Sequence, residues 1–302
     1  MARKKRGRPK RQRRQRQQAQ YEVLDKYPVL PPHAFARIVR DLRSLNIMYQ
    51  AIEPPLNKKE QVQFDEIMDI YVKSLTADIE EIDSDPDGYL RAAMDQIIKS
   101  YGMKISKKSR SKIFYYLRRD LLGYGRMDVL MNDANVEDVS LDGTNIPIFA
   151  YHRKFESVET SIAWPTDEEL ESFVIKLAQR CGKHISVAEP LLDATLMDGS
   201  RIVMKLGYEI STKGSTFCIR RFREDPFSPC DIVAFRTMTS LMVAYMWIAF
   251  QQGISMLFVG GTASGKTTTL NAMALFIPWQ MKIVSIESTR EVNIPQPNWI
   301  PG

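Results

Sequence analysis

Residues 260–267 read GGTASGKT, and this stretch decides the fold because it fits the pattern GxxxxGK[ST] of a phosphate-binding loop. An apolar run at 254–259 precedes the loop and predicts a buried strand. A helix is predicted from Lys266 to about Phe276, and a second strand over 281–286. Strand, glycine loop, helix and strand make a βαβ unit with parallel strands, so the sequence predicts an α/β fold around this loop.

The loop has the residue types that hold nucleotide phosphates. Glycines permit backbone angles that point successive N–H groups inward, and the positive end of the following helix adds to that anion site. Lys266 would reach the β- and γ-phosphates, and the Thr267 hydroxyl would ligate Mg²⁺. The predicted cofactors are therefore ATP and Mg²⁺. The predicted nucleotide-binding residues are Gly260, Gly261, Thr262, Ala263, Ser264, Gly265, Lys266, Thr267 and Thr268.

Two carboxylates follow the second predicted strand, Glu287 and Glu291. Side chains at the carboxyl edge of a parallel sheet face the crevice where nucleotide binds. There the two acids could hold Mg²⁺ through water or orient the attacking water, which makes both catalytic candidates. A solvated charged loop is an equally good interpretation of the same residues.

The charge of the chain is concentrated at its start. The chain has 302 residues, is 44% hydrophobic and carries a formal net charge of +6, yet ten Lys and Arg side chains lie between Arg3 and Arg16. The remainder is therefore mildly acidic, and residues 1–20 are predicted to be a disordered arm that contacts a polyanion or anionic lipid. Three separated cysteines favour a reducing cytosol over a disulfide framework, and no apolar run is long enough to predict a membrane span.

The spacing of apolar residues divides the rest of the chain. Recurrence at three and four residues predicts a helical module over 21–122, and β-rich segments predict a mixed α/β domain over 123–224. Two prolines predict a linker over 225–230, after which 231–302 begins the nucleotide-binding domain. The first apolar positions that indicate helix are Phe35, Ile38, Val39, Leu42 and Leu45.

Four segments resemble the archaeal type II/IV secretion system ATPases, which include archaellum and pilus motor subunits. They are LLGYGRMDVLMNDANVEDVSLDG (121–143), IPIFAYHRKFESVETSI (146–162), FVGGTASGKTTTLNAM (258–273) and SIESTREVNIPQPNWIP (285–301). The third segment is longer than a generic phosphate loop, and all four occur in the expected order. Together they cover most of the chain after the basic arm.

This resemblance implies a RecA-like ATPase domain behind an N-terminal regulatory domain, with ATP bound between the two. It also implies a homo-oligomer, expected to be a hexamer, at the cytoplasmic face of a membrane. There it would act on an inner-membrane platform protein of a secretion, pilus or archaellum machine. Family members have an acidic box after the second strand, which Glu287 and Glu291 match, whereas Ser288 stands where an aspartate is usual.

The family also places arginines of the N-terminal domain near the phosphates, where a guanidinium neutralises charge on the transferring group. Arg220 and Arg221 are the main candidates for this catalytic role. For any single arginine on a strand, simple solvation is the stronger interpretation. The full set of candidates by position is Arg201, Arg220, Arg221 and Arg223.

A RecA-like sheet needs further strands with Walker B carboxylates, and the sequence ends at Gly302 before any such segment. We therefore expect a truncated domain that binds nucleotide weakly and hydrolyses it little by itself. Two other functions stay open on the sequence. The basic arm with its Arg6-Gly7-Arg8-Pro9 element favours a DNA-directed P-loop NTPase, and the missing strands favour a non-hydrolysing assembly component.

Overall fold

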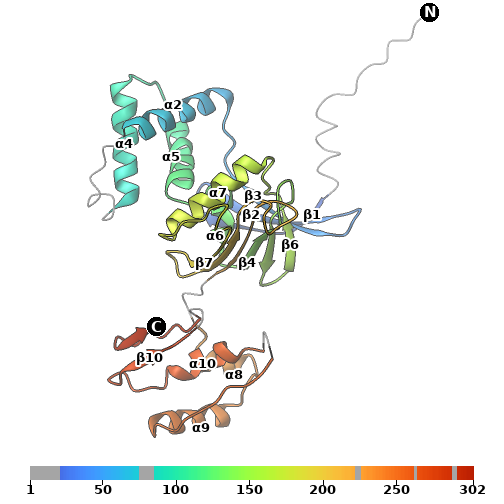
Figure 1. Cartoon of the computed structure of the whole chain (residues 1–302), viewed down its shortest axis with the longest axis vertical. Helices are drawn as coiled ribbons and strands as arrows, with labels where there is room; N and C mark the ends of the chain where they lie inside the picture. The colour runs from blue at the N-terminus through green and yellow to red at the C-terminus, as the bar shows by residue number, and fades with distance from the viewer. Residues whose placement is uncertain (1–20, 75–84, 222–225, 262–263, 288–290) are drawn as a thin grey trace, which may run out of the picture. The chain divides into compact units, whose positions relative to one another are not determined.

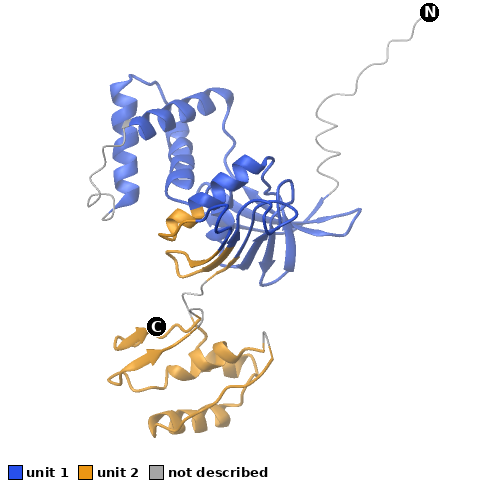
Figure 2. Ribbon diagram, in the orientation of Figure 1, with its two compact units in different colours: residues 1–176, 185–191, 204–218 blue, residues 177–184, 192–203, 219–302 orange. Residues whose placement is uncertain are grey.

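The computed structural model describes residues 21–74, 85–221, 226–261, 264–287 and 291–302. The chain divides into two compact units, which Figure 2 shows in blue and orange. The first unit comprises residues 1–176, 185–191 and 204–218, and the second comprises 177–184, 192–203 and 219–302.

Strands and helices alternate in groups along the chain (Figure 1). The strands are β1 (Tyr21–Leu30), β2 (Ala34–Asp41), β3 (Ile47–Ile52), β4 (Val136–Leu141), β5 (Phe149–His152), β6 (Glu156–Thr160), β7 (Leu191–Thr195), β8 (Arg201–Lys205), β9 (Thr216–Arg220), β10 (Ile283–Ser285) and β11 (Trp299–Pro301). The helices are α2 (Lys58–Ser74), α4 (Pro86–Ser100), α5 (Lys107–Leu121), the 3₁₀ turn η1 (Gly125–Met127), α6 (Asp128–Met131), α7 (Asp167–Arg180), α8 (Pro229–Ala234), α9 (Ser240–Gln251) and α10 (Lys266–Ala274). The predicted mixed α/β class is confirmed.

A nine-stranded sheet has the order β1-β2-β3-β6-β5-β4-β9-β8-β7. β1, β2 and β3 are an antiparallel meander, and β3 joins β6 in parallel through Met48 opposite Glu159. β4, β5 and β6 are a second antiparallel meander. Residues before and after the helices at 58–121 therefore meet in one sheet.

The prediction of helices over 33–52 is wrong, because this stretch forms β2 and β3. In β2 the residues Ala34, Ala36 and Ile38 have no exposed surface, which is the alternation of a strand with one buried face. Leu42 and Leu45, which extended the apparent helical spacing, are instead 53% and 69% exposed at the β2–β3 turn. Neighbouring strands on both sides satisfy the backbone of β2, and this overrides the local spacing.

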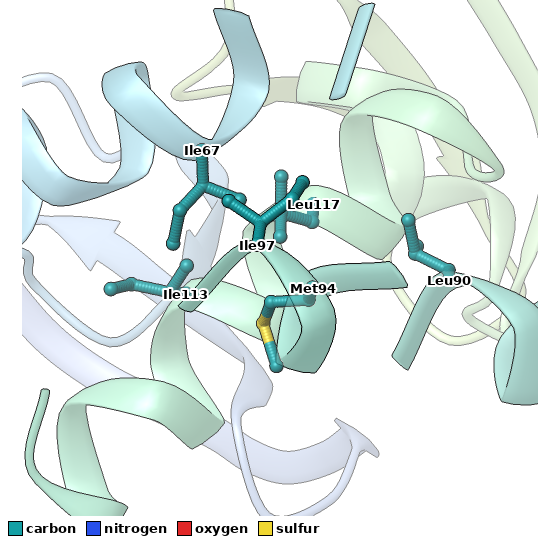
Figure 3. Close-up of a cluster of buried hydrophobic side chains, with 6 residues drawn as sticks. All are labelled: Ile67, Leu90, Met94, Ile97, Ile113 and Leu117. Carbon is teal, nitrogen blue, oxygen red and sulfur yellow. The ribbon is translucent and has the colours of Figure 1, made fainter. Parts of the chain in front are cut away.

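The helical prediction is confirmed for 58–74 and 86–100, and α5 completes a three-helix packing. Side-chain oxygens cap the N-termini of α4 and α5. Asp85 accepts from the Gly88 amide at 2.9 Å, and Ser106 accepts from the Ser109 amide at 3.1 Å. Buried side chains at helical spacing meet between the three helices, as Figure 3 shows. They are Ile67, Leu90, Met94, Ile97, Ile113 and Leu117.

Residues 226–302 of the second unit place the phosphate loop. One sequence prediction is partly wrong here and another is wrong. Residues 226–228 of the expected linker over 225–230 form neither helix nor strand, but α8 begins at Pro229. Pro229 occupies the first turn, where a missing N–H costs nothing, and Ser228 with Asp231 forms a capping box. Residues 254–259 form no strand in the described part of the chain, so the expected βαβ unit is incomplete; β10 pairs in parallel with β11 instead.

α10 is the buried centre of this region. One side packs into a cluster with α8 and α9 through Ala272 and Met273. Its other side packs through Ala274 against Val292 and Ile294. The second half of α10 is thereby packed from two directions. Among the described helices, none has the length and hydropathy needed to span a lipid bilayer.

Candidate nucleotide-binding site

The loop ends where the backbone turns into α10. Gly265 is the N-cap of the helix in the left-handed conformation, with φ 85°, and Lys266 is the first helical residue. A Cβ at Gly260 would lie 2.4 Å from the Ser264 hydroxyl oxygen, so a larger residue there would force the Ser264 side chain to move. The left-handed backbone of Gly265 gives that position a conformational reason to be glycine, whereas a Cβ at Gly261 would meet nothing within 4 Å.

Hydrogen bonds join the described residues on the two sides of the loop. The carbonyl oxygen of Gly261 accepts from the Ser264 hydroxyl at 2.9 Å and from the Lys266 ammonium at 2.5 Å. The Lys266 side chain therefore folds back over the loop backbone. Thr267 and Thr268 lie in the first turn of α10 and are partly exposed. Thr262 and Ala263 lie outside the described residues.

Glu287 follows β10, and its carboxylate binds the backbone of the segment after it. Its Oε2 accepts from the amides of Glu291 at 2.8 Å and Val292 at 2.9 Å. Its Oε1 is buried and has no partner in the described part of the chain. The Glu291 side chain is exposed. Ser288, the departure from the usual acidic box, lies outside the described residues.

Asn271, a residue that the sequence analysis missed, joins α10 to this acidic segment. Its Nδ2 donates to the Glu291 carbonyl at 3.0 Å, and its Oδ1 accepts from the Asn293 amide at 3.2 Å. The signal in the sequence was a lone amide within the apolar part of α10, in the stretch LNAMA. Only the fold reveals its partners, which lie 20 and 22 residues along the chain.

The arginine candidates belong to the nine-stranded sheet or follow it. Arg201 starts β8 and binds Asp193 of β7 through two hydrogen bonds of 3.1 and 2.5 Å, which lower the pKa of that carboxyl. Arg220 ends β9 and is exposed, and Arg221 comes directly after it. Arg223 lies outside the described residues. A role for Arg220 and Arg221 at the phosphates stays a prediction.

An aromatic hollow of about 460 Å³ lies at the opposite end of α10 from the loop. Trp247 and Phe276 stack there at 5.2 Å with their planes 8° apart, and Trp279 and Gln296 also line it. Because this hollow adjoins the last turn of α10, its residues are separate from the phosphate loop at the first turn.

The arrangement fits a polyanion with a divalent cation. The start of α10 offers free backbone N–H groups, a positive helix end and the Lys266 ammonium, which suit phosphate. Thr267 supplies a hydroxyl, and the buried Oε1 of Glu287 needs a donor such as a metal-bound water. Across the described ranges, no group of three or more His, Cys, Asp or Glu side chains could hold a metal ion.

Comparison with known proteins relates the part of the chain that contains the loop to a protein family. Residues 147–300, slightly over half of the chain, match the family described as "Type II/IV secretion system protein". An uncharacterized protein of Methanocaldococcus jannaschii, MJ0900, is 38% identical over 197 residues, which are 65% of this chain and 36% of that protein. The type IV secretion system protein VirB11 of Bartonella henselae is 26% identical over 165 residues, 44% of this chain and 46% of that protein.

The chain thus spans less than half of the length of either of these relatives. Among solved structures, the VirB11 ATPase from the Brucella suis type IV secretion system, in complex with sulphate, is 20% identical. That match covers 62% of this chain and 60% of the other with a TM-score of 0.32, which is too low to equate the two folds. The match over 147–300 is what establishes the relationship: this chain belongs to the type II/IV secretion system protein family.

Proposed function

We propose that this chain is the ATP-binding subunit of a motor that powers a type II or type IV secretion, pilus or archaellum machine. The observation that carries the proposal is the loop at 260–267, whose last glycine is left-handed and leads directly into α10, inside the stretch that matches the family. In this proposal residues 231–302 belong to a RecA-like domain. ATP hydrolysis then moves this domain relative to the N-terminal one.

The proposed chemistry is divided between the phosphate loop with the start of α10 and the acidic segment after β10. Backbone amides of the loop and Lys266 bind the phosphates, and the lysine offsets the charge that accumulates during phosphoryl transfer. The Thr267 hydroxyl would hold Mg²⁺, and the ion would supply positive charge that offsets the charge of the phosphates. Glu291, whose side chain is exposed and whose amide is bound by Glu287, is the candidate to orient the attacking water. Arg220 and Arg221 are candidates to complete the site from the N-terminal side.

Assembly and location are part of the same proposal. We expect a hexamer on the cytoplasmic face of a membrane, in contact with a platform protein of the machine. VirB11 of Bartonella henselae is named as a type IV secretion system protein, and this supports work on a membrane-bound assembly. The basic arm at 1–20, outside the described residues, is expected to contact anionic lipid or another polyanion.

A binding measurement tests the nucleotide site. Lys266→Ala removes the ammonium, and because a hydrogen bond to a charged group contributes about 1.5–3 kcal/mol, the affinity for a fluorescent ATP analogue should fall about 10- to 100-fold. Lys282→Ala is the matched control, since it removes the same charge from an exposed position next to β10. Equal affinities of both variants and the unaltered chain would refute the proposed site.

A further inference from the structure

Asn271 lies one helical turn after Thr267 on the same face of α10, because residues four apart in a helix are neighbours. Its side chain is buried, with 8% of the residue exposed. A buried amide in a short apolar helix costs free energy unless its donors and acceptor are paired. Both partners of this one belong to the acidic segment after β10.

Three consecutive residues of that segment, 291–293, are held by four hydrogen bonds. Asn271 binds the carbonyl of Glu291 and the amide of Asn293. Glu287 binds the amides of Glu291 and Val292 through one carboxylate oxygen. The clamp, defined as Asn271 and Glu287 with residues 291–293, therefore ties both acidic-box glutamates to the helix that begins at the phosphate loop.

Packing around the clamp fixes its position along α10. Leu270 and Ala274, which flank Asn271 on the same side of the helix, contact the cluster that contains Val292 and Ile294. The 3.6-residue period places these positions and Thr267 on one face. The acidic segment thus lies along the face of α10 that carries Thr267.

We propose that Asn271 is a positioning residue for the metal side of the nucleotide site. It touches neither nucleotide nor metal; it sets where Glu287 and Glu291 stand relative to Thr267. The inference rests on the proposed function, because it assigns the clamp to the metal that accompanies ATP. Partners that orient metal ligands from outside change metal affinity about 10- to 100-fold when they are removed.

The test variant is Asn271→Leu, which keeps a similar shape and removes both hydrogen bonds. Its matched control is Gln296→Leu, because Gln296 also joins the acidic segment to α10 by a side-chain amide. Gln296 donates to the carbonyl of Ala274 at 3.1 Å, at the end of α10 away from the loop. Both variants lose helix-to-segment hydrogen bonds, but only Asn271→Leu breaks the clamp.

The first measurement is the affinity for a fluorescent ATP analogue with Mg²⁺ and with EDTA, alongside the thermal midpoint of each variant. We expect the gain in affinity from Mg²⁺ to fall about tenfold in Asn271→Leu, while the affinity in EDTA stays near that of the unaltered chain. Gln296→Leu should keep the full Mg²⁺ gain. An unchanged gain in Asn271→Leu, or an equal loss in both variants, overturns the inference.

The second measurement needs no nucleotide. Hydrogen exchange of the amides of residues 291–293 should accelerate about tenfold or more in Asn271→Leu and stay unchanged in Gln296→Leu. Unchanged exchange at these amides in Asn271→Leu also overturns the inference. If the unaltered chain binds no ATP analogue at all, the proposed function fails. A normal Mg²⁺ gain that survives Asn271→Leu removes this inference alone.

Discussion

β2 and the stretch 254–259 are both rich in apolar side chains, yet only β2 is a strand. β1 and β3 pair with β2 on its two edges, and Ile38 in its middle has no exposed surface. In 254–259, Leu257 and Val259 are 87% and 80% exposed. A run of apolar residues therefore becomes a strand where neighbouring strands supply its hydrogen bonds, and the composition of the run does not decide this by itself.

The largest expected effect comes from the buried member of this pair. Ile38→Ala removes three carbon atoms from a residue with no exposed surface, and such changes lower the free energy of unfolding by about 2–5 kcal/mol. Urea unfolding followed by circular dichroism measures it. A loss below about 1 kcal/mol would contradict the central place of β2 in the core.

The buried polar network beside β2 gives the next effect. Tyr49, opposite Ile38 on β3, donates its hydroxyl to Asp133 at 2.8 Å, and Tyr27 donates to the same carboxylate oxygen at 2.7 Å. Tyr49→Phe should lower the free energy of unfolding by about 1.5–3 kcal/mol, the usual contribution of a hydrogen bond to a charged group. Tyr151→Phe, at an exposed position of β5, is the control and should change little.

The region of the phosphate loop and the β1–β3 meander also show what the sequence could predict. The phosphate loop, the start of α10 and the capped helices were predictable because each depends on residues a few positions apart. The place of the β1–β3 meander in the nine-stranded sheet was not, because β3 pairs with β6 more than 100 residues later. The spacing of Phe35 to Leu45 fitted a helix only when Leu42 and Leu45 were counted as buried positions. Both residues lie instead in the exposed turn between β2 and β3.

The candidate site likewise has residues that the sequence predicts and residues that it does not. Lys266 and Thr267 follow from the motif, and the place of Glu287 after β10 follows from the apolar strand before it. The clamp by Asn271 could not be predicted, since it needs the acidic segment to return to α10, and no local pattern encodes that return. The arginines face the same difficulty, because their distance from the loop depends on how domains assemble.

The stability of the sheet should also depend on pH through His152. Burial lowers the pKa of His152, whose Nδ1 accepts from the Lys154 amide and whose Nε2 is 2.9 Å from the Tyr27 hydroxyl. The folded state thus favours the neutral ring. The neutral ring contributes to the free energy of unfolding. This contribution is fully present above pH 6.5, the ordinary pKa of histidine, and is lost as the pH falls from there through the lower pKa of the folded state.

Unfolding free energies measured between pH 7.5 and about pH 5 check this sign. His152→Gln should flatten part of the fall on the acid side, whereas His184→Gln, at an exposed position, should keep it. Some dependence should remain, because burial also lowers the pKa of His33. A His152→Gln variant with the same pH profile as the unaltered chain would show that the ring does not resist protonation.

The smallest expected change in stability belongs to the exposed member of the pair. Leu257→Ser alters a residue that is 87% exposed, so the free energy of unfolding should change by less than about 0.5 kcal/mol. Self-association should fall, because exposed apolar segments that lack a paired strand favour contact between chains. Light scattering at several protein concentrations measures this, with Thr237→Ser as a control outside the stretch. A loss of stability as large as that of Ile38→Ala would mean that 254–259 is covered in solution as β2 is, and the contrast between the two stretches would disappear.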